Sequence, residues 1–380
     1  MSAPHIVYFG QTPGQGTGSP IILLRHLRRL AAHGWKVSLV AESGQSTEVA
    51  ETEGWPVFHL SLRKPWWPPF RPENRLSRAV RMRLWAAECG GFFPEPPRAV
   101  LTYLGLHSTL HSEAAARYAR RCGAPLTVLV HDYPPAFPDF SPEDVPSVLR
   151  RQLAVLREAR QVWFASPQLA ARYPLPPERS GVLIPIPEGG GEAVRWSPTF
   201  AESPLIVYAG AVYPAQFPLF RALARAFHAA GARLLLLARR TPGLDALCAA
   251  EPVERRDLFP TNAQALAFLR AEAAAVLASY CERVEEMPWI ATSFPSKFAE
   301  FTHLGLPLLL AAPAESAIGL WAAQNGYPDF LPAAEPRALA AFVEALKTEA
   351  AWNKKAAATA HFAQTAFDPD AIQAAFEAKL

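Results

Sequence analysis

The sequence predicts an α/β protein built from two Rossmann-like, doubly wound domains with parallel sheets. Short apolar runs typical of buried strands alternate with helical patterns along most of the 380 residues. A chain of this length exceeds one ordinary core, so two domains are expected. A polar, glycine-rich stretch from Glu188 to Pro198 interrupts the alternation once and separates two series of elements.

The first series begins with a strand at His5–Phe9, followed by a glycine-rich loop that contains Gly14, Gly16 and Gly18 and leads into a helix. This order of elements favours phosphate binding. The spacing differs from the dinucleotide fingerprint because the last glycine comes one residue early. Glu42, after the next strand, keeps a nicotinamide-dependent oxidoreductase as an alternative. Further strands are expected at 37–41, 57–60, 99–103, 126–130, 161–165 and 182–184.

The strand at 126–130 delivers His131 and Asp132 to its carboxyl end. Ligands bind at that edge of open parallel sheets, and both side chains titrate. A histidine that bonds a substrate hydroxyl and an orienting His–Asp pair within a loop are the two alternatives.

Composition excludes several classes of partner and site. The 37 basic and 34 acidic residues give a net charge of +3, which is too balanced for a nucleic-acid partner. In the segment Arg71–Arg83, arginines interleave with apolar residues as on an amphipathic helix. A solvated helix face is the favoured interpretation, and contact with a membrane surface or an anionic acceptor is the alternative. The four scattered cysteines lack metal-ligand spacing, and no targeting or spanning segment stands out, so we expect a cytoplasmic protein without a metal.

The second series repeats the α/β alternation, with strands expected at 205–209, 233–238, 253–258, 275–278 and 308–312. Gly210 follows the first of these strands. Arg239 and Arg240 close the carboxyl end of the second, where phosphate binding and simple solvation are both open. Three helical patterns at 336–347, 352–366 and 369–379 end the chain.

The most informative stretch runs from Thr292 to Pro307. Ser293 is expected to cap a helix with Pro295 at its first position, and Gly305 is expected at C′. A helix N-terminus at the carboxyl edge of a sheet favours an anion, and Lys297 adds positive charge. Glu300, one turn later, can accept hydrogen bonds from a diol. The alternative is a solvated ion pair between Lys297 and Glu300.

This order of elements resembles the GT-B glycosyltransferases, specifically the retaining family-4 branch, over essentially the whole chain. The segment Phe294–Phe301 with Gly305 and Pro307 is similar to the family's P-S-K-x-x-E-[YF]…G-x-P motif. Trp163–Leu169 and Ile206–Gly210 resemble further family segments. The resemblance implies two Rossmann-like domains that face each other across a cleft. We therefore expect an acceptor-side domain at 1–187, a linker at 188–203, a donor domain at 204–350, and C-terminal helices at 351–380 whose last member crosses back.

The resemblance also implies roles for residues. Glu300 would bind ribose, Ser296 and Lys297 would hold the diphosphate, and His131 would contact the transferred sugar. The loop at 14–18 would approach the phosphates or the acceptor. The implied reaction moves a sugar from a nucleotide diphosphate sugar, UDP- or GDP-linked, to a hydroxyl of a glycan, a lipid-linked molecule or a small molecule. It needs no cofactor or metal.

Two departures from the family pattern leave other functions open. Thr292 stands where the family often has an acidic residue, and the basic residues often found just after Gly210 are absent. The diphosphate charge would then be met by Lys297, Arg239 or Arg240, or by backbone N–H groups alone. A GT-B-shaped binding protein or inactive subunit is the main alternative, and a sugar-nucleotide epimerase is a further one.

Overall fold

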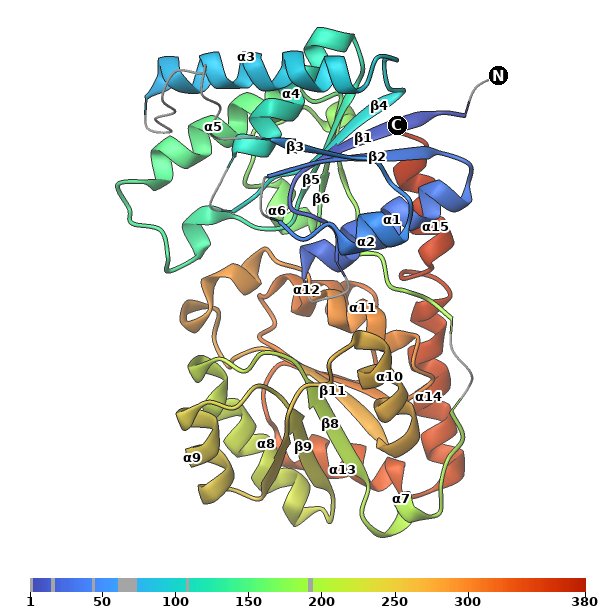
Figure 1. Ribbon diagram of the computed structural model, residues 1–380. Helices are drawn as coiled ribbons and strands as arrows, with labels where there is room; N and C mark the ends of the chain where they lie inside the picture. Colours follow the sequence, from blue (N-terminus) through green and yellow to red (C-terminus); the bar gives the residue numbers. More distant parts are fainter. Residues whose placement is uncertain (1–2, 15–17, 43–44, 61–73, 107–108, 191–193) are drawn as a thin grey trace. The chain divides into compact units, whose positions relative to one another are not determined.

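A computed structural model describes residues 3–14, 18–42, 45–60, 74–106, 109–190 and 194–380. The chain forms two compact units (Figure 1). The first comprises the residues up to Ile184 together with Ile372–Leu380, and the second comprises Pro185–Ala371. Each unit contains one sheet in which every described strand pair is parallel.

The sheet of the first unit has the strand order β3-β2-β1-β4-β5-β6-β7. Its strands are β1 (His5–Phe9), β2 (Lys36–Glu42), β3 (Val57–Leu60), β4 (Ala99–Tyr103), β5 (Leu126–Val130), β6 (Gln161–Phe164) and β7 (Ser180–Val182). The central strands are continuous apolar runs, as both faces of a parallel sheet are covered. The chain runs outward from β1 in both directions, so the order reverses between β1 and β4, which is where such sheets bind ligands.

Helices surround this sheet. They are α1 (Ser19–Ala32), α2 (Glu48–Thr52), α3 (Arg75–Phe92), α4 (Leu110–Cys122), α5 (Val145–Glu158) and α6 (Pro167–Ala170). The last helix of the chain, α15 (Pro369–Glu377), also joins the first unit from Ile372 onward. Its Gln373 amide lies 2.8 Å from Nδ1 of His26, and the ring of Phe376 packs 4.6 Å from that imidazole.

The sheet of the second unit has the order β10-β9-β8-β11-β12-β13. Its strands are β8 (Leu205–Ala209), β9 (Arg233–Leu237), β10 (Val253–Arg256), β11 (Ala275–Ser279), β12 (Leu308–Ala311) and β13 (Phe330–Leu331). Its helices are α7 (Thr199–Glu202), α8 (Phe217–Ala229), α9 (Pro242–Ala250), α10 (Asn262–Glu272), α11 (Ser296–Thr302), α12 (Ala317–Gln324), α13 (Pro336–Leu346) and α14 (Glu349–Ala363).

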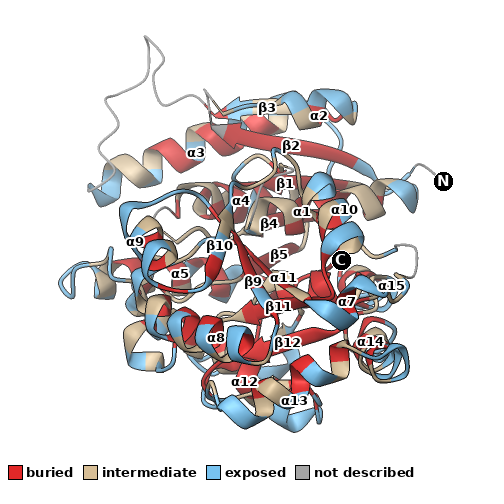
Figure 2. Cartoon of the chain, turned by 90° about the horizontal axis from the view of Figure 1, so that it is seen from below, coloured by how far each residue is buried: buried red, intermediate tan, exposed pale blue. Residues whose placement is uncertain are grey.

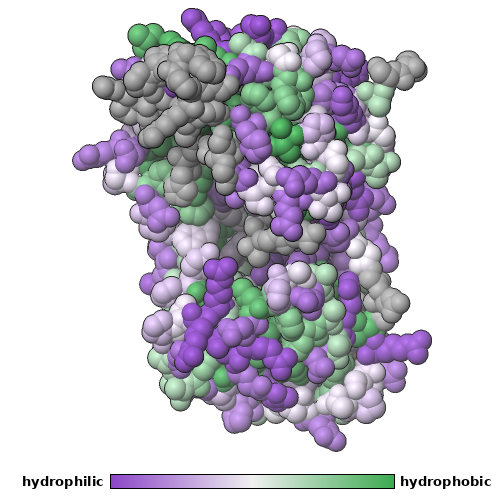
Figure 3. Space-filling model, viewed as in Figure 1, coloured by the Kyte–Doolittle hydropathy of each residue, from purple (hydrophilic) through white to green (hydrophobic). Residues whose placement is uncertain are grey.

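The core of each unit lies on its sheet. Figure 2 shows that the strands are largely buried whereas most helices alternate buried and exposed residues. Hydrophilic side chains gather over part of the second unit in the view of Figure 3. In that unit the ring of Phe298 lies 5.5 Å from Trp321, 5.1 Å from Tyr327 and 5.7 Å from Phe367. This aromatic cluster anchors the short helix α11 in the core.

Several predicted boundaries shift. Helix α11 begins at Ser296, with Pro295 as an extended N-cap, so Ser293 is not its cap. The N–H of Ser293 instead closes the preceding turn by donating to the carbonyl of Trp289 at 2.8 Å. Gly305 does adopt positive φ (74°), but it follows the C-cap His303 by two residues instead of one. The strand expected at 182–184 is β7, at Ser180–Val182.

The segment expected as a linker belongs to the second unit. The division falls after Ile184, and Pro185 already groups with the second unit. The N–H of Glu188 donates to Oε2 of Glu300 at 3.3 Å, and a short helix, α7, lies within the expected linker range. Helix α14 begins at Glu349, two residues before the expected C-terminal segment.

The arginines of α3 do not form one solvated face. Arg81 is only 2% exposed, whereas Leu76 is 74% exposed. The guanidinium of Arg78 forms an ion pair with Glu113 of α4. The alternation of arginines with apolar residues predicted a solvated face, but arginines that pair across a helix interface can lie on the packed side. Arg71 and the first part of the basic segment lie outside the described residues.

Candidate functional site

Lys297, in the first turn of α11, reaches the carboxyl end of β8. Its Nζ donates a 2.6 Å hydrogen bond to the carbonyl of Ala209, the last residue of that strand. A Cβ atom at Gly210 would lie 3.0 Å from this ammonium. The missing side chain at Gly210 therefore leaves the space in which the ammonium sits. The structure brings Lys297 and Gly210 together, two residues separated widely in the sequence.

The charge of Lys297 has no carboxylate partner within the described part of the chain. Burial lowers the pKa of this lysine from 10.5 to about 8. A buried cation without a counter-ion is costly, and binding an anion removes part of that cost. An anionic ligand at this position would therefore be favoured by the charge of Lys297.

Glu300 lies one turn further along α11 and is 6% exposed. Its Oε2 accepts the backbone N–H of Glu188 at 3.3 Å. No ion pair joins Glu300 to Lys297, because the lysine turns toward Ala209. The two side chains are therefore not the solvated surface pair that their spacing allowed. They present a cation and a carboxylate from one helical turn.

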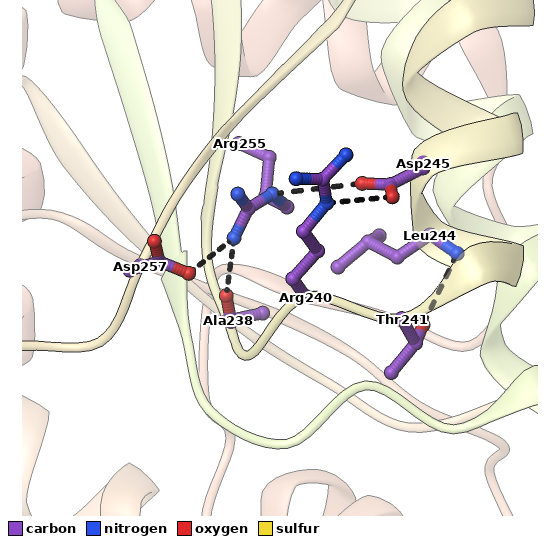
Figure 4. Close-up of polar contacts among 7 residues, drawn as sticks. All are labelled: Ala238, Arg240, Thr241, Leu244, Asp245, Arg255 and Asp257. Atoms are coloured by element: carbon purple, nitrogen blue, oxygen red, sulfur yellow. Dashed lines mark hydrogen bonds and ion pairs between the residues drawn. The ribbon is translucent and has the colours of Figure 1, made fainter.

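Figure 4 shows the polar contacts after β9. Nε of Arg240 donates to Asp245 of α9 at 2.8 Å. Nη1 of the neighbouring Arg255 donates to Asp257 at 2.6 Å and to the Ala238 carbonyl at 3.2 Å. These contacts fix Arg240. Its neighbour Arg239 is exposed and makes no hydrogen bond or ion pair among the described residues. Of the two arginines, only Arg239 has a guanidinium whose donors face no protein acceptor.

Thr292 is buried at 1% exposure, and its hydroxyl donates to the carbonyl of Trp289 at 3.3 Å. This side chain stabilises the turn that precedes α11. Pro295 caps the helix and Ser296 opens it, half-buried, so both lie at the free N–H groups of the first turn.

Sequence reasoning missed two residues that shape the same edge. Tyr208 lies beneath Gly210, where a Cβ would come 3.2 Å from its hydroxyl, and that hydroxyl donates to the Ala211 carbonyl at 2.6 Å. Gln216 donates to the Ser279 carbonyl at 3.2 Å and fixes the loop after β8 to β11. The sequence did contain a signal for Tyr208, because a tyrosine precedes a glycine by two residues in both units, as Tyr8 and Gly10 and as Tyr208 and Gly210. The Tyr8 hydroxyl makes the corresponding bond in the first unit, to the Gln11 carbonyl at 3.0 Å.

In the first unit, His131 and Asp132 follow β5 and each contacts a hydroxyl. Nδ1 of His131 lies 3.0 Å from Oγ of Ser19, at the start of α1. The Tyr103 hydroxyl, at the end of β4, donates to Oδ2 of Asp132 at 3.0 Å. Burial, with a smaller effect of nearby His26, lowers the pKa of His131 to about 3, so its imidazole is neutral near pH 7. The direct His131–Asp132 pair, one of the two alternatives that the sequence left open, is not formed.

The glycine-rich loop is described only in part. The N–H of Gly14 donates to the Pro20 carbonyl at 3.3 Å, and Gly18 is the N-cap of α1 with φ of 77°. Positive φ is easily reached only by glycine, which explains this residue at the helix start. Gly16 lies outside the described residues.

Among the described residues, no cluster of three or more His, Cys, Asp or Glu side chains could hold a metal ion. The four cysteines are all free thiols. None of the described helices combines the length and apolar character needed to cross a membrane.

Comparison with solved structures shows which proteins share this architecture. HepE from Anabaena, solved with UDP and glucose, is 14% identical with a TM-score of 0.64, covering 99% of this chain and 98% of its own. A glycosyltransferase from Rickettsia africae is 11% identical with a TM-score of 0.67, covering 100% and 98%. MurG from Acinetobacter baumannii is 14% identical with a TM-score of 0.55, covering 99% and 98%. The chain thus has the fold of GT-B glycosyltransferases.

No family model matches the sequence. A search of curated proteins likewise finds no match. Identities this low establish the fold alone.

Proposed function

We propose that this protein is a glycosyltransferase that moves a sugar from a nucleotide diphosphate sugar to an acceptor hydroxyl. The observation that carries the proposal is the half-buried ammonium of Lys297, which has no carboxylate partner among the described residues, one helical turn before the buried carboxylate of Glu300. A diphosphate and a ribose diol are separated by a similar short span. The glycosyltransferase fold supports the same ligand class.

In this proposal catalysis rests on positioning and on stabilising the leaving group. Charge accumulates on the diphosphate as the glycosidic bond to it breaks. Lys297 and the free N–H groups at Ser296 and Lys297 would meet that charge, with Arg239 as a second cation. The cation at the diphosphate would then be a side chain, and neither a metal nor a cofactor is needed.

Further details of the proposal rest on family resemblance and on the neighbours' ligands. Glu300 would bind the ribose hydroxyls, and His131 would contact the transferred sugar. HepE was solved with UDP-glucose, so a uridine nucleotide is the first to test and a guanosine nucleotide the second. The resemblance to the family-4 branch supports retention of the anomeric configuration. The acceptor would be a glycan, a lipid-linked molecule or a small molecule.

The test is a thermal-shift panel with UDP, GDP, ADP, CDP and dTDP. A ligand at a hundred times its dissociation constant adds about 2.7 kcal/mol to the free energy of unfolding. We expect one diphosphate to stabilise the wild type but neither Lys297→Ala nor Glu300→Ala. Glu300→Ala should cost more than about 1.5 kcal/mol of binding, as for a charged hydrogen bond.

The matched control is Lys347→Ala, because Lys347 also donates to a backbone carbonyl, that of Ala230, in the same unit. This control should bind the nucleotide normally. No stabilisation by any of the five diphosphates would overturn the proposal. Binding without turnover of the corresponding sugar nucleotide would instead favour a non-catalytic binding protein, and conversion of the free donor without an acceptor would indicate an epimerase.

A further inference from the structure

Three helices of the first unit carry a strong positive charge. α4 packs against both α3 and α5, so the three lie together in that unit (Figure 1). They contain ten arginines and three glutamates, with neither lysine nor aspartate, which gives a net charge of +7. The whole chain has a net charge of +3, so all other residues together sum to −4. Positive charge is therefore concentrated on these helices, where it raises the local concentration of anions.

Three adjoining pockets form a groove along these helices. The first, of about 430 Å³, is lined by residues of α3, α4 and α5. The second, of about 440 Å³, shares Arg120 with the first and continues to the start of β5. The third, of about 670 Å³, shares Pro125 and Arg160 with the second and lies at the amino ends of β4, β5, β6 and β7. We call the three pockets the arginine groove. It ends at the edge of the sheet opposite to that of His131.

The arginine groove has an excess of positive charge that the protein does not neutralise. Arg120 forms an ion pair with Glu158, and Arg179 donates to the Arg157 carbonyl at 2.7 Å. Among the lining carboxylates of the described chain, Glu178 alone has no hydrogen bond or ion pair. Six lining cations have neither a side-chain hydrogen bond nor an ion pair within the described residues: Arg75, Arg83, Arg98, Arg117, Arg160 and Lys379.

The floor of the groove is apolar. Met82, Ala116, Val155 and Leu126 line the first two pockets and are buried, whereas the unpaired cations are exposed or half-buried. No aromatic ring lines any of the three pockets within the described chain. The groove therefore offers C–H contacts at its floor and guanidinium groups at its rim, and a guanidinium binds a carboxylate through two parallel hydrogen bonds.

We propose that the arginine groove binds an anionic polysaccharide, a glycan chain whose sugars carry carboxylates. Such a chain has C–H faces for the apolar floor and repeated charges for the rim. A polyphosphate chain has no apolar face, and single-stranded nucleic acid needs aromatic rings on which its bases stack. A flat bilayer would touch the rim and leave the floor empty. The glycan would be an acceptor or product held away from the donor site, and this role, unlike the binding itself, rests on the proposed function.

Titration calorimetry of the full-length protein with alginate oligosaccharides, which are chains of carboxylated sugars, tests the binding. We expect affinity that falls steeply between low and physiological salt, because contacts with several exposed cations are screened. Dextran, a neutral glucan, should not bind. Combining Arg117→Gln, Arg160→Gln and Lys379→Gln removes three of the unpaired cations and should weaken alginate binding about tenfold or more.

A matched triple variant separates the groove from the net charge of the protein. Lys36→Gln, Arg337→Gln and Lys354→Gln together remove the same charge, but these three exposed cations lie outside the three pockets. This control should bind alginate like the wild type. An equal loss in both triple variants would overturn the proposal, because net charge alone would then explain the binding.

Polyphosphate, oligothymidine and phosphatidylglycerol vesicles test the other occupants. Tighter binding of any of them than of alginate, through the same three cations, would overturn the assignment to a polysaccharide, as would a wild type that does not bind alginate. Lys297→Ala should bind alginate normally, because Lys297 belongs to the second unit. If alginate binds through the groove and no nucleotide diphosphate stabilises the protein, the proposed function fails and the polysaccharide site stands. The opposite result removes the site alone.

Discussion

Replacing Lys297 with methionine should stabilise the free protein while it removes nucleotide binding. Burial lowers the pKa of Lys297 from 10.5 to about 8. At about 1.4 kcal/mol per pKa unit, the charged form destabilises the folded state by roughly 3 kcal/mol. Methionine has a similar length and no charge, and loses a hydrogen bond to Ala209 worth about 1 kcal/mol. The net gain is about 2 kcal/mol, or roughly 4–8 °C in the melting temperature of a unit of this size.

The direction of the pKa shift determines how the stabilisation by Lys297→Met changes with pH. The folded pKa lies below the unfolded value, so between about pH 8 and 10.5 the unfolded chain binds more protons. The cost of the ammonium is fully present below pH 8 and disappears as pH rises toward 10.5. The advantage of Lys297→Met should therefore be largest at pH 7 and shrink at higher pH.

Differential scanning calorimetry at pH 7 and pH 10, with and without nucleotide, measures both effects. Lys347→Met is the control, because Lys347 is paired with Glu344 at 2.7 Å and its removal should bring no stabilisation. Saturating nucleotide should reverse the order of wild type and Lys297→Met, since only the wild type gains binding energy. A lower melting temperature for Lys297→Met at pH 7 in the absence of ligand would refute the argument that this ammonium is buried at a cost.

Three other predictions concern neighbouring features. Arg239→Ala should weaken nucleotide diphosphate binding several-fold by titration calorimetry, whereas Arg240→Ala should not; equal losses would contradict the distinction between a free and a paired guanidinium. Gly210→Ala places a methyl group 3.0 Å from the Lys297 ammonium, so it should reduce nucleotide affinity with little change in far-ultraviolet circular dichroism. Burial lowers the pKa of His26 to about 4, below its unfolded value, so stability should fall as pH drops from about 6.5 to 4. In urea unfolding measured at several pH values, His26→Gln should remove roughly 3 kcal/mol of this loss of unfolding free energy. If the unfolding free energy of the variant falls with pH as in the wild type, His26 is not the source of the pH dependence.

The sequence by itself determined the architecture of this protein. Short apolar runs rich in β-branched residues, such as Leu126–Val130, favour strands buried on both faces, and their alternation with helical patterns predicts doubly wound parallel sheets. Length and the interrupted alternation predicted two α/β units, whereas the GT-B fold was expected from the resemblance of segments such as Phe294–Phe301 to that family, and the fold is confirmed. The candidate residues at strand ends could be named because parallel topology gathers carboxyl ends at one edge. Their roles stay predictions.

Only the tertiary structure decided how those residues are used. Spacing allowed Lys297 and Glu300 to pair with each other, and burial against Ala209 and Glu188 separates them instead. The partners of His131 lie on α1 and β4, far away in the sequence, so no local pattern could indicate the hydroxyl of Ser19. Local sequence determines the helices and strands, because secondary-structure propensity acts between residues that are close in the sequence. The state of a buried charge or imidazole depends on groups that distant segments bring together, and on the water that they exclude.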